Sequence, residues 1–146
     1  MIKTRPKSYN SWGSTTVAKK KSYIQRIEKA FSTSYPGHIP LNKDLYGLVY
    51  HFYKESGGHD ADNISKPVWD CLRGILYDDD KRVKMRIVGS FEMTTDYITV
   101  IGSSGLSGKL IAELLDALET EDHLLYVECG TFSPAMIQLN IAQNAN

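Results

Sequence analysis

The sequence predicts an α+β fold, in which a small mixed β-sheet carries packed helices and is followed by a C-terminal helical extension. Amphipathic segments of helical periodicity alternate along the chain with short runs rich in β-branched and aromatic residues. The 146 residues suffice for one domain that buries roughly two-thirds of its unfolded surface. Hydrophobic residues at 42% and charged residues at 23% are typical of a globular protein.

The N-terminal third is predicted to form a loop and then a helix. Residues 1–13 contain Pro6 and Gly13 and indicate a loop, with room for a very short strand. Good N-cap residues at 14–16 predict a helix that runs to about Ser32. Its apolar side chains form one stripe, made of Tyr23, Ile24, Ile27, Ala30 and Phe31.

A strand and a second helix should follow. The segment LYGLVYHFY, Leu45 to Tyr53, is rich in β-formers and predicts a strand. A helix is then expected over residues 62–75, with Pro67 tolerated only within its first turn and fraying at Gly74. Its polar face carries Asp62, Lys66, Asp70 and Arg73.

The remaining segments predict another strand, a linker and a third helix. Val83 to Phe91 should form a long strand that pairs as a hairpin with Tyr97 to Ile101. A Gly/Ser loop over 102–108 leads to an amphipathic helix at 106–120. The apolar run HLLYVECG, which begins at residue 123, has the composition of a strand.

Composition excludes several classes of protein. No apolar run approaches the roughly 20 residues that span a bilayer, and the N-terminus lacks the apolar region of a signal peptide. Cys71 and Cys129 are too few for a disulfide framework, so we expect reduced thiols and a cytoplasmic location, with no membrane partner.

The net charge of zero conceals a strong asymmetry. Residues 1–43 hold nine Lys or Arg and one acid, whereas residues 103–146 hold one base and six acids. A basic N-terminal third favours a polyanionic partner, but a solvated lysine face on a helix would give the same pattern. Net charge alone does not decide between these interpretations.

The sequence does not match the residue spacing of three common ligand-binding motifs. The loop from Gly102 to Gly108 lacks the GxxxxGK-S/T pattern of a phosphate-binding loop. DADN starts like an EF-hand, but the fifth, sixth and twelfth positions are Ile64, Ser65 and Cys71. The four histidines lack the close spacing of a zinc site.

Two groups of carboxylates flank the second predicted helix. Asp60 and Asp62 stand at its start, and Asp79 and Asp80 stand beyond its end. If the chain folds back, these groups can converge, and hard oxygen ligands without sulfur select Mg²⁺ or Mn²⁺. Such a site supports phosphoryl transfer, with Lys66 placed to neutralise a phosphate. The alternative is that the acids cap a helix and solvate a turn.

These residues resemble the RusA family of Holliday-junction resolvases, often encoded by phages and prophages. The resemblance lies in D-x-D-N-x-x-K, an acid four residues after the lysine, a leucine, a D-D pair and a strand. In this sequence those positions are Asp60, Asp62, Asn63, Lys66, Asp70, Leu72, Asp79, Asp80 and Val83. The resemblance covers roughly residues 5–102. We take residues 1–102 as the nuclease core and residues 103–146 as an extension packed on or near it.

The resemblance implies a Mg²⁺-dependent endonuclease, with Mn²⁺ as a substitute, that works as a homodimer and nicks two strands of branched DNA. It assigns catalysis to Asp60, Asp62, Lys66 and Asp80, and metal binding to Asp60, Asp62, Asp79 and Asp80. We expect DNA contacts from Lys19, Lys20, Lys21, Arg26, Lys66 and Arg73. The rival interpretations are the same scaffold acting on other DNA or RNA structures, and a non-catalytic DNA-binding or regulatory protein.

Overall fold

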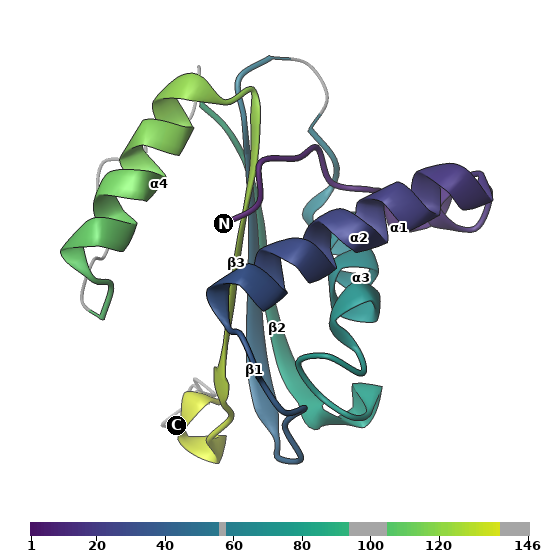
Figure 1. Cartoon of the computed structure of the whole chain (residues 1–146), viewed down its shortest axis with the longest axis vertical. Helices are drawn as coiled ribbons and strands as arrows, with labels where there is room; N and C mark the ends of the chain where they lie inside the picture. Colours follow the sequence, from purple (N-terminus) through teal and green to yellow (C-terminus); the bar gives the residue numbers. More distant parts are fainter. Residues whose placement is uncertain (56–57, 94–104, 138–146) are drawn as a thin grey trace, which may run out of the picture.

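In the part of the chain that the structure describes, three strands form a mixed sheet with helices on both faces (Figure 1). The computed structural model describes residues 1–55, 58–93 and 105–137. The helices are α1 (Tyr9–Trp12), α2 (Val17–Ser34), α3 (Ala61–Leu72) and α4 (Gly108–Thr120). The strands are β1 (Leu45–Tyr53), β2 (Val83–Glu92) and β3 (His123–Thr131), and two 3₁₀ turns are η1 (Asp80–Arg82) and η2 (Pro134–Met136). The predicted α+β class with a small mixed sheet is confirmed.

The strand order is β2-β1-β3. β1 pairs parallel with β2, from Leu45 opposite Val83 to Tyr53 opposite Glu92, and antiparallel with β3 along its whole length. The connection from β1 through α3 to β2 is therefore a β-α-β crossover. This topology puts the C-terminal ends of β1 and β2 at one edge, where α3 begins.

The two faces of the sheet carry separate clusters of apolar side chains. α2 and α3 cover one face, with Tyr23, Ile27 and Trp69 in the larger cluster. α4 covers part of the other face, where Leu114 packs on Phe52. Figure 1 shows α3 and α4 on opposite sides of the strands.

Gly47 in β1 allows a close approach between α3 and the sheet. A Cβ atom at this position would lie 2.1 Å from the Trp69 ring. Trp69 is fully buried, so the indole occupies the space that any other residue at 47 would fill. Burial of the indole against the glycine fixes how α3 sits on the strands.

The helices occur where the sequence predicts them, with shifted ends. α2 begins after Thr16, whose hydroxyl accepts a hydrogen bond from the backbone of Lys19. The prediction for Pro67 was wrong, because it lies in the second turn of α3 rather than the first. Its ring is fully buried, and we attribute the tolerance of the missing backbone hydrogen bond to this packing. The single turn α1 lies inside the segment predicted as a loop.

The C-terminal segment contributes to the sheet. β3, predicted only from its apolar composition, pairs with every residue of β1. The predicted hairpin partner of β2, residues 97–101, lies outside the described residues. The division at residue 102 stays a prediction. No helix in the described ranges is long and apolar enough to cross a membrane.

Candidate active site

An open depression of about 460 Å³ lies where β1 and β2 end and α3 begins. Its lining residues are Tyr53, Gly58, His59, Asp60, Ala61, Ser90 and Glu92. They come from the end of β1, the start of α3 and the end of β2. Crevices at the carboxyl ends of parallel strands are common ligand sites in sheets with helical crossovers.

Asp60 lies in this depression as the residue that precedes α3. Its backbone is extended, and its side chain makes no capping hydrogen bond to the helix. The carboxylate therefore remains available for a ligand, while the positive end of the helix dipole favours its charge. Asp62 is exposed in the first turn of α3, two residues further on.

Glu92 is a second carboxylate in the depression, and sequence reasoning missed it. It closes β2 and is paired in register with Tyr53, the last residue of β1. Parallel pairing puts both residues at the edge where α3 starts. A β-α-β crossover predicted from the sequence would have placed Glu92 at this edge. The sequence analysis instead predicted a hairpin between this strand and residues 97–101.

Three histidines surround the inner side of this edge. His51 is fully buried on β1, and its Nε2 lies 3.1 Å from Nδ1 of His123 on β3. Burial lowers the pKa of His51 to about 3, with the nearby His123 as the next cause. Burial also lowers the pKa of His59, followed by the positive charge of Arg5. The pKa is lowered in all three histidines, which favours the neutral imidazole, and His59 itself lines the depression.

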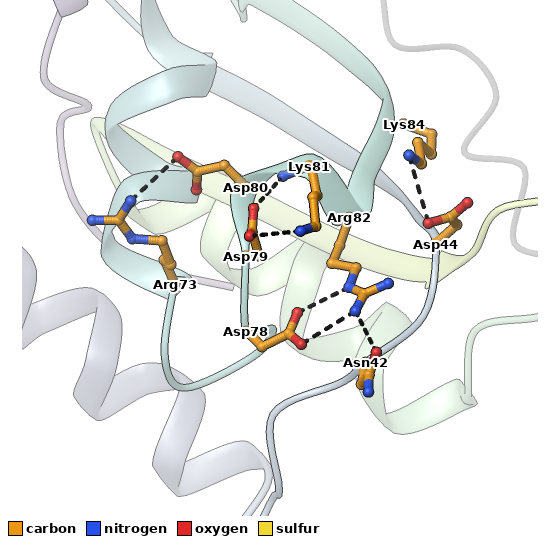
Figure 2. Close-up of polar contacts among 9 residues, drawn as sticks. All are labelled: Asn42, Asp44, Arg73, Asp78, Asp79, Asp80, Lys81, Arg82 and Lys84. Carbon is orange, nitrogen blue, oxygen red and sulfur yellow. Dashed lines mark hydrogen bonds and ion pairs between the residues drawn. The ribbon is translucent and has the colours of Figure 1, made fainter.

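Asp79 and Asp80 lie elsewhere, in the turn that precedes β2 (Figure 2). Asp80 Oδ2 accepts a hydrogen bond from Arg73 Nη1 over 3.4 Å, and its Oδ1 lies 3.3 Å from the Tyr77 hydroxyl. Asp79 accepts hydrogen bonds from the backbone and the side chain of Lys81, which lower its pKa. Each carboxylate already has a cationic neighbour.

The extra acid in this turn, Asp78, is also paired. Arg82 Nε donates to its Oδ1 over 3.0 Å, and the arginine also contacts Asn42. Figure 2 shows these contacts around the turn. The hydrogen bond from Arg82 lowers the pKa of Asp78. This ion pair supports a structural role for Asp78.

One chain does not bring the two groups of carboxylates together. Asp60 precedes α3, whereas Asp80 contacts Arg73, which follows its last residue. A helix of 12 residues spans about 18 Å. Within residues 1–55, 58–93 and 105–137, no three His, Cys, Asp or Glu side chains form a group that could hold a metal ion.

Lys66 and Arg73 lie on α3 between these groups. Lys66 Nζ donates to Asp70 Oδ1 over 2.8 Å, one turn further along the helix. Its side chain is 41% exposed, so a phosphate near α3 can compete with Asp70 for the ammonium group. Acids and bases alternate along this exposed face from Asp62 to Asp80.

The predicted DNA-binding residues on α2 differ in their surroundings. Lys19 and Lys21 are exposed. Lys20 donates to the Gly13 carbonyl over 3.3 Å and lies 5.7 Å from the centre of the Trp12 ring. Arg26 donates to the hydroxyl of Thr4 over 3.0 Å. That these residues bind DNA stays a prediction.

The side chains at the depression offer the type of ligand atom that binds magnesium. Mg²⁺ is usually held by one or two carboxylates, with water and substrate phosphate as the other ligands. Asp60 and Glu92 supply two carboxylates at one depression. Among the described residues that line it there is no cysteine and one histidine, His59, which favours a hard cation over zinc.

Comparison with known proteins identifies the family of the chain. The model of the family described as Endodeoxyribonuclease RusA matches residues 1–100. No curated protein and no solved structure matches the chain. The match covers more than two-thirds of the sequence and includes the whole β1-α3-β2 crossover. The chain therefore belongs to the RusA endodeoxyribonuclease family.

Proposed function

We propose that this protein is a Mg²⁺-dependent endonuclease that resolves Holliday junctions by paired phosphodiester hydrolysis. Membership of a family that acts on branched DNA supports the substrate. The observation that carries the proposal is Asp60, an uncapped carboxylate in an open depression at the start of α3. The position matches the first aspartate of the D-x-D-N-x-x-K motif.

Asp60 and Glu92 would hold the cation, with Asp62 close to them on the first turn of α3. A bound Mg²⁺ supplies a Lewis acid for the phosphate and lowers the pKa of a water molecule. The oxygen of water forms a bond to phosphorus as the bond from phosphorus to the 3′ oxygen breaks. One proton from water ends on that oxygen, so the products carry a 5′-phosphate and a 3′-hydroxyl.

Lys66 would stabilise the charge that develops on the phosphate. Its present partner is Asp70, at 2.8 Å, in a partly exposed pair. Exposed pairs of this kind contribute little to stability, about 0.3–0.5 kcal/mol, so the protein loses little stability when the ammonium group turns to DNA. Arg73 is tied to Asp80 in a similar way.

A homodimer is part of the proposal. Two symmetric cuts need two active sites, and a four-way junction has matching symmetry. The separation of Asp60 from Asp80 in one chain adds a second reason. In a dimer, Asp79 and Asp80 of one protomer would approach the Asp60 depression of its partner. They would then complete the metal site across the dimer interface.

A panel of labelled substrates tests the proposal. Four-way junctions, forks, flaps, linear duplex and RNA are incubated with the protein, with and without Mg²⁺. We expect nicks in the four-way junction that require Mg²⁺ and little cutting of linear duplex. Preferred cutting of forks, flaps or RNA would assign the scaffold to another substrate. Junction binding without any cutting would indicate a regulatory protein.

A further inference from the structure

We propose that Arg5 and Lys7 bind a DNA phosphate at the edge of the Asp60 depression, beside the phosphodiester that is cut. The inference rests on the proposed function and names the residues that hold the substrate at that site. Neither residue belongs to the motif around Asp60, and the family match by itself gives them no role.

The N-terminal segment is anchored to the core at every second residue. Ile2 exchanges two backbone hydrogen bonds with Leu125 of β3, over 2.8 and 2.9 Å. Thr4 is buried and accepts from Arg26, and Pro6 is fully buried. Figure 1 shows the segment running from β3 toward α1. The backbone that carries Arg5 is therefore fixed.

Because every second residue of this segment is buried, the basic side chains between them lie on its outer side. Ile2, Thr4 and Pro6 are buried, whereas Lys3 and Arg5 between them are exposed and Lys7 is partly exposed. Lys3 is paired with Glu121 over 2.8 Å. No ion pair of Arg5 or Lys7 occurs in the described part of the chain, so both charges remain for a ligand.

The same segment lies against the residue that precedes Asp60. Residues 3–8 connect Ile2, which is bridged to β3, with α1, which packs against α3. Burial lowers the pKa of the His59 ring, and the charges of Arg5 and Lys7 and the backbone of Pro6 also influence that pKa. The charge of Arg5 also reaches His51 and His123. His59 lines the depression together with Asp60. The two cations are thus grouped at one edge of the carboxylate site.

A nuclease needs positively charged side chains next to the carboxylates of its active site. Asp60 and Glu92 repel a phosphate that approaches the depression, and cations at its edge offset that repulsion. An arginine side chain can bind phosphate through two parallel hydrogen bonds. By contrast, Lys66 and Arg73 already pair with acids of their own chain. Arg5 and Lys7 are better placed to hold the backbone next to the cut.

The test measures junction affinity without divalent metal, so it does not depend on cleavage. A labelled four-way junction is titrated by fluorescence anisotropy with wild type, Arg5→Ala, Lys7→Ala and the double variant. The double variant should bind at least about 10-fold more weakly. The slope of log affinity against log salt should become shallower by about 0.9 for each phosphate that the variant no longer neutralises. The Gln variants at both positions repeat the test with longer side chains.

Lys109→Ala is the matched control for each single variant. Lys109 is an exposed lysine on α4, across the sheet from α3, and its removal changes the net charge equally. Its affinity should stay within about twofold of wild type. If wild type binds and cuts while the double Ala and Gln variants bind like Lys109→Ala, this inference alone is overturned. A wild-type protein that neither binds nor cuts overturns the proposed function with it.

Discussion

Asp60 and Asp80 lie at opposite ends of α3, although both match acids of the RusA motif. Asp60 precedes the helix and lines the depression at the ends of β1 and β2. Asp80 contacts Arg73 and Tyr77 beyond the other end. A single chain therefore separates carboxylates that one metal site would need, and a dimer offers a way to combine them.

Mixing two inactive variants tests that arrangement. Asp60→Asn and Asp80→Asn are each expected to cut junctions poorly, because each removes a carboxylate ligand. In a co-refolded equal mixture, half of the dimers would be mixed, and each would keep one intact site if the acids come from different chains. Nicking should recover to roughly one quarter of wild type, given a symmetric dimer. No recovery would show that Asp60 and Asp80 do not combine across chains.

Tyr77→Phe should lower stability modestly. The buried hydroxyl of Tyr77 donates to the Trp69 carbonyl over 2.7 Å, next to Asp80. The backbone of Arg73 also reaches that carbonyl, at 3.2 Å, so the acceptor keeps one partner. We expect a loss of about 1 kcal/mol in the free energy of unfolding, measured by urea titration.

Tyr35→Phe is the control for this measurement, because Tyr35 is 60% exposed. It should change the free energy of unfolding by less than about 0.5 kcal/mol. Equal effects at Tyr35 and Tyr77 would contradict the role given to the Tyr77 hydroxyl.

Acid should destabilise the fold through His51. Its pKa is about 3 in the folded state, lowered by burial, against about 6.5 when unfolded. Between these values the unfolded chain binds the extra proton, so the free energy of unfolding falls as the pH drops from about 6.5 toward 3. His51→Gln should remove part of this pH dependence, as urea titrations at pH 7 and pH 5 would show. An unchanged difference between the two pH values would rule out His51 as a cause.

Lys66→Ala and Asp70→Ala should have different effects on cleavage. Their ion pair is partly exposed, so neither change should cost more than about 1 kcal/mol of stability. Lys66→Ala removes the proposed phosphate cation, and cleavage should fall at least about 10-fold without loss of metal affinity. Asp70→Ala releases the ammonium group, so cleavage should hold or rise. Equal losses of cleavage in both variants would mean that Lys66 acts only while it is paired with Asp70.

The sequence predicted the elements of the fold better than their pairing. Leu45 to Tyr53 has the composition of a strand throughout, and β1 has those bounds. The parallel pairing of β1 with β2 depends on contacts between distant residues that composition does not encode. The prediction for Pro67 was wrong for a similar reason, because the burial of its ring is a tertiary effect.

The candidate site was predictable in part. The D-x-D-N-x-x-K motif predicts Asp60 as a site residue through its combination of residue types and spacing, and the structure places Asp60 in a depression. Glu92 and Arg5 have no local motif, and only the crossover and the anchored N-terminal segment bring them to the same edge. Spacing places Asp79 and Asp80 beyond the end of α3, but it could not show that a single chain keeps them apart from Asp60.

The central claim is that the Asp60 carboxylate supports Mg²⁺-dependent cutting of junction DNA. The most direct measurement is a strand-labelled four-way junction assay with wild type and Asp60→Asn, alongside affinity measured without metal. We predict that wild type nicks two opposing strands only with Mg²⁺. Asp60→Asn should lose at least about 100-fold in rate, since loss of even an outer partner of a metal site costs 10–100-fold. Its junction affinity should hold or rise, because one charge that repels phosphate is gone. A folded Asp60→Asn variant that cuts at the wild-type rate would contradict the account.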